Sequence, residues 1–158
     1  MPEVRAHRTS FGINTLVLAK ASSRPMDVQA ASSSGTPGTP RSYPNLPPRP
    51  DDVIVPKHRF SGFYDTQLDT ILRQRGVDTL IVTGCTTSIC VESTIRDAFY
   101  RDYRCLLLAD CTAEPLGREN ARTNHDASLL TIEALFGWVS DSSAFRDAMT
   151  ANTAASQR

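Results

Sequence analysis

From residue 53 onward, short runs of aliphatic and β-branched residues alternate with longer segments whose apolar positions have helical spacing. The short runs predict strands at 53–55, 79–83, 105–108 and 138–140, and the longer segments predict helices at 66–75, 89–101 and 120–136. Gly76 and Gly137 follow two of these helices, as C-terminal caps commonly do. Strand and helix in this rhythm predict an α/β fold: a parallel sheet with helices on both faces and right-handed crossovers.

The first fifty residues have a different pattern. Residues 22–50 hold seven of the ten prolines and a tract of Ser, Gly, Thr and Pro, which buries too little apolar surface to offset its ordering entropy. We therefore expect an irregular, disordered segment over 1–50, a single domain over 51–150 and a disordered tail over 151–158. Within the first segment, residues 13–19 also have the pattern of one short strand.

The start of the chain is a poor match to a targeting signal. Arg5 and Arg8 precede the apolar run 11–19, but Gly12 and Asn14 interrupt that run. It is also far shorter than the roughly 20 apolar residues that span a bilayer. We expect a cytoplasmic protein with no membrane partner.

Charge and cysteine content exclude several classes of protein. The chain has 17 basic and 17 acidic residues, a balance that argues against nucleic acid as a partner. Its four cysteines form no Cys-x-x-Cys pair, and its three histidines are scattered, so no metal ligand set is visible. The sequence indicates intracellular thiols, no metal and no cofactor.

Reactive groups of parallel sheets gather at the carboxyl ends of the strands, and two residues at these ends have suggestive chemistry. Lys57 follows the first predicted strand in a chain with fifteen arginines and only two lysines. A partly buried lysine can pass a proton, whereas arginine stays charged. Cys90 stands in the first turn of a predicted helix, where backbone N–H groups favour the thiolate.

Each residue also has a plainer interpretation. A lysine at a strand end is usually exposed, and a free cysteine is usually a buried structural residue. Three aromatic residues follow Lys57 and are candidates for the wall of a small substrate pocket, although aromatic clusters more often belong to the core: Phe60, Phe63 and Tyr64. The residues alone leave both interpretations open.

Several motifs in a fixed order resemble one known family. They are Val55-Pro56-Lys57, the segment 61–69, the segment 83–94 around Gly84-Cys85-Thr86 and Cys90-Val91-Glu92, and Phe136-Gly137-Trp138-Val139-Ser140. Over about residues 51–141 the chain resembles the isochorismatase-like cysteine hydrolases. Within that superfamily it is most similar to the ureidoacrylate amidohydrolase branch.

The resemblance implies a site built from a Cys nucleophile, a Lys and an Asp, of which the first two correspond to Cys90 and Lys57. It further implies a cis peptide bond between Cys85 and Thr86, so that the backbone N–H groups of Thr86 and Cys90 form an oxyanion hole. Family members that use a metal carry an Asp-x-His motif, which is absent here. The implied partners are a small amide or ureido substrate and a second copy of the chain in a homo-oligomer.

The family's Asp ends an amino-terminal strand in an apolar-apolar-Asp-x-Gln pattern that residues 1–50 do not contain. Alignment of the run 16–18 with that strand puts Ala19 or Lys20 where the carboxylate belongs, and Asp27 is the remaining acid. The chain therefore resembles an amino-terminally truncated or rearranged member. Two hypotheses follow: a cysteine amidohydrolase impaired by loss of the Asp, or an inactive remnant that binds a ligand or partner.

Overall fold

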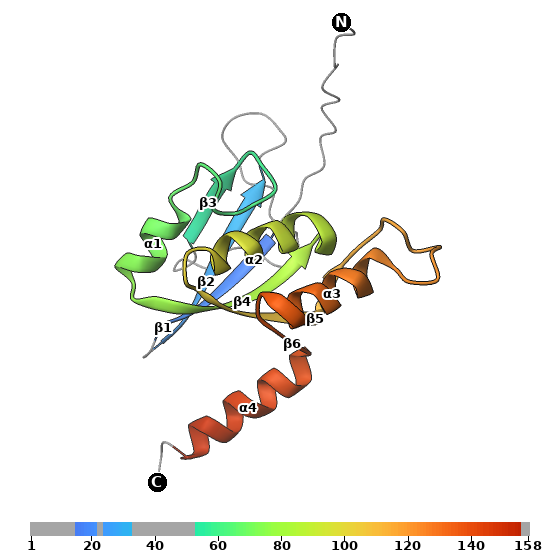
Figure 1. Cartoon of the computed structure of the whole chain (residues 1–158). Helices are drawn as coiled ribbons and strands as arrows, with labels where there is room; N and C mark the ends of the chain where they lie inside the picture. The colour runs from blue at the N-terminus through green and yellow to red at the C-terminus, as the bar shows by residue number, and fades with distance from the viewer. Residues whose placement is uncertain (1–14, 22–23, 33–52, 156–158) are drawn as a thin grey trace, which may run out of the picture.

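The computed structural model describes residues 15–21, 24–32 and 53–155, with side chains from 53 to 151, as one six-stranded sheet with flanking helices (Figure 1). The sheet has the order β3-β2-β1-β4-β5-β6. Its strands are β1 (Thr15–Ala21), β2 (Arg24–Ser32), β3 (Val53–Lys57), β4 (Val77–Cys85), β5 (Arg104–Ala113) and β6 (Trp138–Ser140). The helices are α1 (Leu68–Gln74), α2 (Glu92–Phe99), α3 (Asn124–Leu135) and α4 (Ser142–Ala155), and a π-helical turn η1 (Thr87–Val91) leads into α2.

The α/β class is confirmed, with one correction to the sheet. β4, β5 and β6 are parallel, as are β2 and β3, but β1 is antiparallel to both of its neighbours, β2 and β4. Only two residues connect β1 to β2, and a connection that short joins antiparallel strands, since a parallel crossover needs a dozen or more residues. The sheet is therefore mixed, although the sequence pattern predicts a parallel one.

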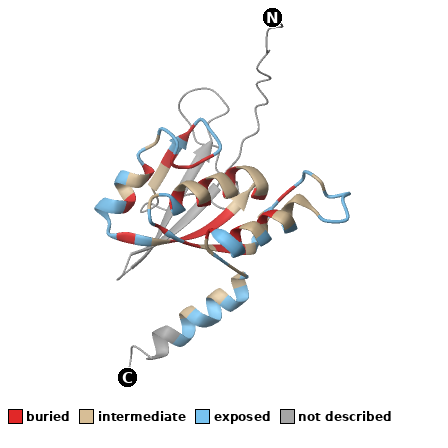
Figure 2. Ribbon diagram, in the orientation of Figure 1, coloured by how far each residue is buried: buried red, intermediate tan, exposed pale blue. Residues whose placement is uncertain are grey.

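The core lies between the sheet and the helices α1, α2 and α3. Figure 1 shows α2 and α3 over one face of the sheet and α4 on the other side of β5 and β6. In Figure 2 the buried residues concentrate on the sheet and its covering helices, whereas α4 is half-buried or exposed where it is described. The largest fully buried side chains include Leu68, Leu72, Leu80, Ile95, Leu107 and Ile132. This packing holds the carboxyl ends of β3 and β4 in fixed positions.

Two expectations about the chain ends differ from the structure. Strands β1 and β2 occupy part of the segment 1–50 expected to be irregular, and α4 continues to Ala155, inside the expected tail. Asp141 explains the start of α4, because its Oδ1 accepts the N–H groups of Ser143 at 2.9 Å and Ala144 at 2.8 Å. The predictions for 1–14, 22–23, 33–52 and 156–158 lie outside the described residues.

The direction of β1 determines which of its residues lie near the carboxyl end of β4. Thr15 pairs with Gly84 at that end, whereas Ala19 pairs with Leu80, four residues away. At about 3.3 Å per residue, Ala19 is on the order of 13 Å from the end where Cys85 lies. Asp27 precedes Val28, whose partner Val53 begins β3, so Asp27 is at the opposite end of the sheet from Lys57. None of the three positions considered for the family's Asp, Ala19, Lys20 and Asp27, lies at the carboxyl end.

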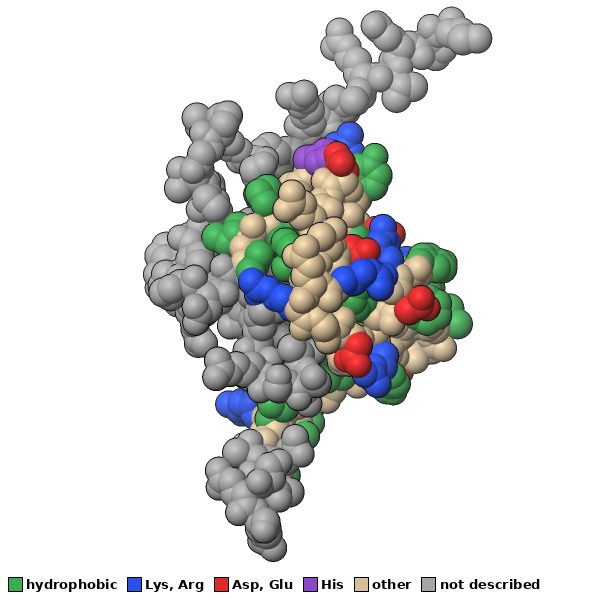
Figure 3. All heavy atoms as spheres, turned by 90° about the vertical axis from the view of Figure 1, so that its left-hand side faces the viewer, with side chains coloured by type: hydrophobic (Ala, Val, Ile, Leu, Met, Phe, Trp, Pro, Cys, Tyr) green, Lys and Arg blue, Asp and Glu red, His purple; other side chains and the backbone are tan. Residues whose placement is uncertain are grey.

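The surface agrees with the balanced charge of the sequence. On the face shown in Figure 3, acidic and basic side chains of the described residues are interspersed rather than gathered by sign. Across the described ranges, the helices are too short or too polar for a membrane crossing.

We expect Gly137→Ala to destabilise the fold strongly. A Cβ at this position would overlap the backbone oxygen of Cys105 and lie 3.1 Å from its Cβ, because the chain passes directly over β5 as it enters β6. The expected loss in the free energy of unfolding is about 3 kcal/mol, measured by urea denaturation. Gly76→Ala is the control: it has φ +64° but nothing within 4 Å, so the expected loss is about 1 kcal/mol. Equal losses would contradict the steric explanation.

Candidate active site

The structure brings Lys57 and Cys90 together at the carboxyl end of the sheet. Lys57 ends β3 and is 2% exposed, and Cys90 is fully buried in η1. The Nζ of Lys57 lies 3.7 Å from the Cys90 Sγ and donates to the backbone oxygens of Arg59 at 3.1 Å and Phe60 at 3.2 Å. The interpretation of Lys57 as an exposed lysine at a strand end is therefore wrong.

Burial dominates the acid–base properties of this pair. Burial lowers the pKa of the Lys57 ammonium, while the neighbouring Cys90 opposes that change. Burial also raises the pKa of the Cys90 thiol, against the charge of Lys57 and a hydrogen bond from the backbone of Thr86. The expectation that the start of the helix favours the thiolate needs correction, because loss of water outweighs these contacts. Lys57 is nevertheless placed to take the thiol proton and to stabilise the thiolate that forms.

The segment between β4 and α2 surrounds the sulfur with backbone groups. The peptide bond between Cys85 and Thr86 is cis, where the family resemblance places it. The N–H of Thr86 donates to the Cys90 sulfur, and its carbonyl oxygen accepts the N–H groups of Ile89 and Val91, each at 3.2 Å. A backbone donor from the cis-peptide segment thus contacts the sulfur.

Thr94 connects this segment to the loop after β3. Its buried hydroxyl donates to the backbone oxygen of Cys90 at 2.7 Å and accepts the N–H of Gly62 at 2.9 Å. One side chain therefore connects the turn that contains Cys90 to the loop that follows Lys57. Sequence reasoning treated Thr94 as part of a motif and assigned it no role.

The four cysteines differ in their surroundings. All four are free thiols: Cys90 and Cys105 are buried, Cys85 is half-buried and Cys111 is exposed. Burial raises the pKa of Cys105 to about 12. Cys90 differs from the equally buried Cys105 in having Lys57 and the Thr86 N–H beside it. Among the described residues, no three His, Cys, Asp or Glu side chains gather as a metal site.

The three aromatic residues proposed to line a pocket differ in burial. Phe63 is 4% exposed, belongs to the main core and stacks at 5.7 Å on Tyr103, so the structure places it in the core instead. Phe60 and Tyr64 are more than half exposed. Tyr64 meets the ring of His58 edge-on at 5.8 Å. The pocket role stays a prediction for these two exposed residues.

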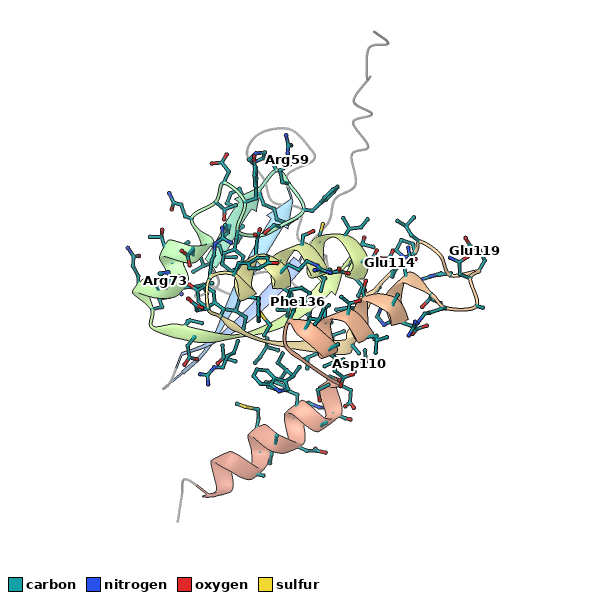
Figure 4. All side chains as sticks on the ribbon, viewed as in Figure 1. Arg59, Arg73, Asp110, Glu114, Glu119 and Phe136 are labelled. Atoms are coloured by element: carbon teal, nitrogen blue, oxygen red, sulfur yellow. The ribbon has the colours of Figure 1, made fainter. Side chains whose placement is uncertain are left out.

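Sequence reasoning missed two further groups at this end of the sheet. Glu114 is buried and contacts Ser88, and His125 Nδ1 lies 3.0 Å from the hydroxyl of Thr87. The signal that could have identified Glu114 is its position directly after a strand. The sequence pattern predicts that this strand ends at residue 108, whereas β5 continues to Ala113. Figure 4 shows Glu114 where the chain leaves β5 for the loop toward α3.

The fold and the buried Lys–Cys pair define an α/β protein with a cysteine site at the carboxyl end of its sheet. Residues 8–144 match the Isochorismatase domain family, and the chain belongs to that family. It is 51% identical over 104 residues to a ureidoacrylate amidohydrolase RutB from Methylobacterium radiotolerans, a match that covers 66% of this chain and 39% of that protein. The corresponding protein of Methylorubrum extorquens is 46% identical over 112 residues. The chain thus spans about two fifths of the length of these curated relatives.

Solved structures support the same assignment. A cysteine hydrolase from Pseudomonas syringae has 41% identity and a TM-score of 0.60, over 66% of this chain and 52% of that one. An isochorismatase-like hydrolase from Alkaliphilus metalliredigens has 33% identity and a TM-score of 0.65, over 77% and 69%. An N-carbamoylsarcosine amidase from Thermoplasma acidophilum has 26% identity and a TM-score of 0.58, over 72% and 69%.

Proposed function

We propose that this chain is a cysteine amidohydrolase that cleaves a C–N bond of a small amide or ureido compound without a metal. The 3.7 Å approach of Lys57 Nζ to Cys90 Sγ is the observation that carries this proposal. The names of the relatives support it, since they include ureidoacrylate amidohydrolases and an N-carbamoylsarcosine amidase. The proposed setting is the cytoplasm, with no cofactor and no nucleic-acid or membrane partner.

The proposed reaction has two steps on Cys90. The thiol proton passes to a neutral Lys57, the sulfur attacks the carbonyl carbon, and the negative charge on the carbonyl oxygen is held by the N–H groups of Thr86 and Cys90. The nitrogen leaves with a proton from the Lys57 ammonium, and a thioester (a thiocarbamate for a ureido carbonyl) remains on Cys90. Water then cleaves it and restores the thiol.

Among residues 53–151, the main groups that act on the pKa of the Cys90 thiol are Lys57, Thr86 and Cys85, with no carboxylate among them. Lys57 therefore carries the proton transfer in this scheme. Burial lowers the pKa of Lys57, which increases the neutral fraction able to accept a proton. The rate should rise with pH as the pair loses its first proton, because the reactive form holds a single proton that passes between Cys90 and Lys57 and then to the leaving nitrogen.

The direct test is ammonia release from a panel of ureidoacrylate, N-carbamoyl amino acids and simple primary amides, combined with mass spectrometry of the rapidly quenched protein. We expect slow turnover of at least one compound and an acyl adduct on the peptide that contains Cys90. Absence of both turnover and adduct across the panel and up to high pH would reject the proposal.

A second candidate is a catalytically inactive family member that binds a small ligand or a partner. The raised pKa of the buried Cys90 thiol favours it, because little thiolate forms at neutral pH. We also propose that the chain forms a homo-oligomer. Its support is a set of exposed aromatic and aliphatic side chains near the ends of α2 and α3: Phe99, Tyr100, Leu135 and Trp138. Measured binding of the panel compounds without turnover would favour this candidate.

We expect Tyr64→Ala to raise the KM for amide substrates several-fold while it changes the stability by less than about 0.5 kcal/mol. The side chain is 54% exposed and contacts the His58 ring, so its removal opens no cavity in the core. KM from ammonia release and Tm from thermal denaturation measure the two effects. A large fall in Tm with an unchanged KM would assign Tyr64 to the fold and not to substrate binding.

We expect Ala19→Asp to give no gain in rate, because the register of β1 places Ala19 opposite Leu80, far from the site. Thr15→Asp is the matched variant at the other end of the same strand, opposite Gly84, and it should raise the rate of ammonia release about tenfold or more by supplying a general base. A gain in Ala19→Asp that disappears with Cys90→Ala would show that β1 runs in the opposite direction.

A further inference from the structure

Glu114 has a carboxylate aimed at the backbone of the nucleophile's segment. The residue follows β5 and is 5% exposed. Its Oε2 accepts the backbone N–H of Ser88 at 2.9 Å and also the Ser88 hydroxyl, and its Oε1 accepts the N–H of Leu116 at 2.9 Å. Figure 4 labels Glu114 between the loop toward α3 and the helical segment that leads into α2.

Glu114 places a carboxylate in the interior, where a neutral side chain would have a lower desolvation free energy. Burial of a carboxylate is unfavourable unless its oxygens are hydrogen-bonded, and bonds to a charged acceptor are stronger than neutral ones. Both oxygens accept hydrogen bonds, and the ion pairs within the described residues do not include Glu114. The charge is therefore directed to the backbone N–H groups of Ser88 and Leu116.

The position of Ser88 gives this contact its importance. Ser88 lies midway between Thr86 and Cys90, the residues whose N–H groups form the proposed oxyanion hole. The neighbouring Thr87 is fully buried, and its hydroxyl lies 3.0 Å from His125 Nδ1 at the start of α3. Two consecutive residues of the segment are thus anchored by side chains from the chain that follows β5.

We propose that Glu114 is a positioning residue: through Ser88 it holds the backbone from Thr86 to Cys90 so that the Thr86 N–H stays aimed at the sulfur and at the oxygen of a bound carbonyl. This inference rests on the proposed function, because it assigns Glu114 to the same site. It predicts that loss of the carboxylate changes the chemistry of Cys90 even where the fold is retained.

The test compares Glu114→Ala and Glu114→Gln with the wild-type chain in two assays that need no turnover. The first is the pH profile of iodoacetamide labelling of Cys90, which reports the thiol alone. The second is protection of Cys90 by acetaldehyde, which adds to the thiol: the S–C bond forms and the carbonyl oxygen takes the proton, giving a thiohemiacetal that uses the oxyanion hole. Lys57 and Cys85, the ionisable groups within residues 53–151 that act on the Cys90 thiol, are unchanged in every variant.

In Glu114→Ala we expect the labelling profile to move to higher pH, because the Thr86 N–H no longer stabilises the thiolate. Protection by acetaldehyde should weaken about tenfold or more. Glu114→Gln should show a smaller loss, since its amide oxygen can still accept the N–H of Ser88. Glu119→Ala is the matched control: it removes an exposed carboxylate from the same loop, labelled in Figure 4, and should behave as wild type.

A Glu114→Ala chain with a wild-type labelling profile and wild-type acetaldehyde protection would overturn the proposal, whatever its Tm. If Glu114→Ala does not fold, the same two assays are applied to Glu114→Gln and Ser88→Ala. Wild-type behaviour of both variants would contradict the positioning role of Glu114. Ammonia release separates the two proposals. If Glu114→Ala shifts the labelling profile but the wild-type chain shows no turnover, the positioning role is upheld and the hydrolase proposal is rejected. If the wild-type chain turns over substrate but Glu114→Ala leaves the profile unshifted, the hydrolase proposal is upheld and the positioning role is rejected.

Discussion

Cys90→Ala is expected to abolish ammonia release and acyl-adduct formation, the largest effect of any single substitution in this chain. The reaction proposed here has no nucleophile without the sulfur, and the other three thiols lack its surroundings. Cys105 is equally buried but has a pKa of about 12, and Cys111 lies on the surface. Ammonia release from the most active panel compound measures the effect.

Cys85→Ala is the control, because Cys85 lies next to the same segment but is half-buried, whereas the Lys57 Nζ contacts the Sγ of Cys90. This variant should keep most of the wild-type rate. If turnover survived Cys90→Ala and was lost in Cys85→Ala, the nucleophile would be misassigned.

The wild-type chain also holds an internal comparison between two equally buried thiols. Iodoacetamide should label Cys90 faster than Cys105 at neutral pH, because Lys57 and the Thr86 N–H stabilise only the Cys90 thiolate. Peptide mass spectrometry after timed quenching gives both rates in one experiment. Equal rates would mean that the contacts around Cys90 do not activate it.

The part of the fold after residue 53 could be predicted because its signals are local. Apolar runs such as 79–83 and helical spacing at Leu68, Ile71 and Leu72 depend on neighbours in the sequence, and the structure has β4 and α1 there. The direction of β1 could not be predicted in this way. It depends on pairing with β4, far along the chain, and on a two-residue connection to β2.

The site was predictable to the extent that motifs mark it. Lys57 and Cys90 were found from their places after strands and from the family resemblance, and the structure brings them within 3.7 Å. The pocket and core interpretations of Phe63 could not be separated from the sequence, because both have the same local pattern; its ring contact with Tyr103 joins residues 40 positions apart. Glu114 was missed because its role depends on Ser88, which is 26 positions away.

The electrostatics of Cys90 depend on burial, which the sequence does not contain. Local reasoning counts the helix start and Lys57, both of which favour the thiolate. The folded chain adds the removal of water, and this effect is the larger one, so the pKa of the thiol rises. A site of this kind needs a proton acceptor close to the sulfur, and among the side chains that the structure describes, Lys57 lies in that position, 3.7 Å from Sγ.

Lys57→Met is accordingly expected to lower the rate of ammonia release by about 10²–10⁴-fold, the usual contribution of a general base. The substitution also removes the positive charge that lowers the pKa of Cys90, so labelling by iodoacetamide should shift to higher pH. Met keeps most of the apolar stem of the lysine, which limits any effect on packing at this buried position.

Lys57→Arg separates the two contributions of the lysine. A guanidinium keeps the charge, so the labelling profile of Cys90 should stay closer to wild type than in Lys57→Met, but it cannot accept a proton near neutral pH. Ammonia release should therefore be nearly as slow in Lys57→Arg as in Lys57→Met. Wild-type turnover in Lys57→Arg would show that the charge alone is needed and that the thiol proton goes elsewhere. Wild-type turnover in both variants would remove Lys57 from the mechanism.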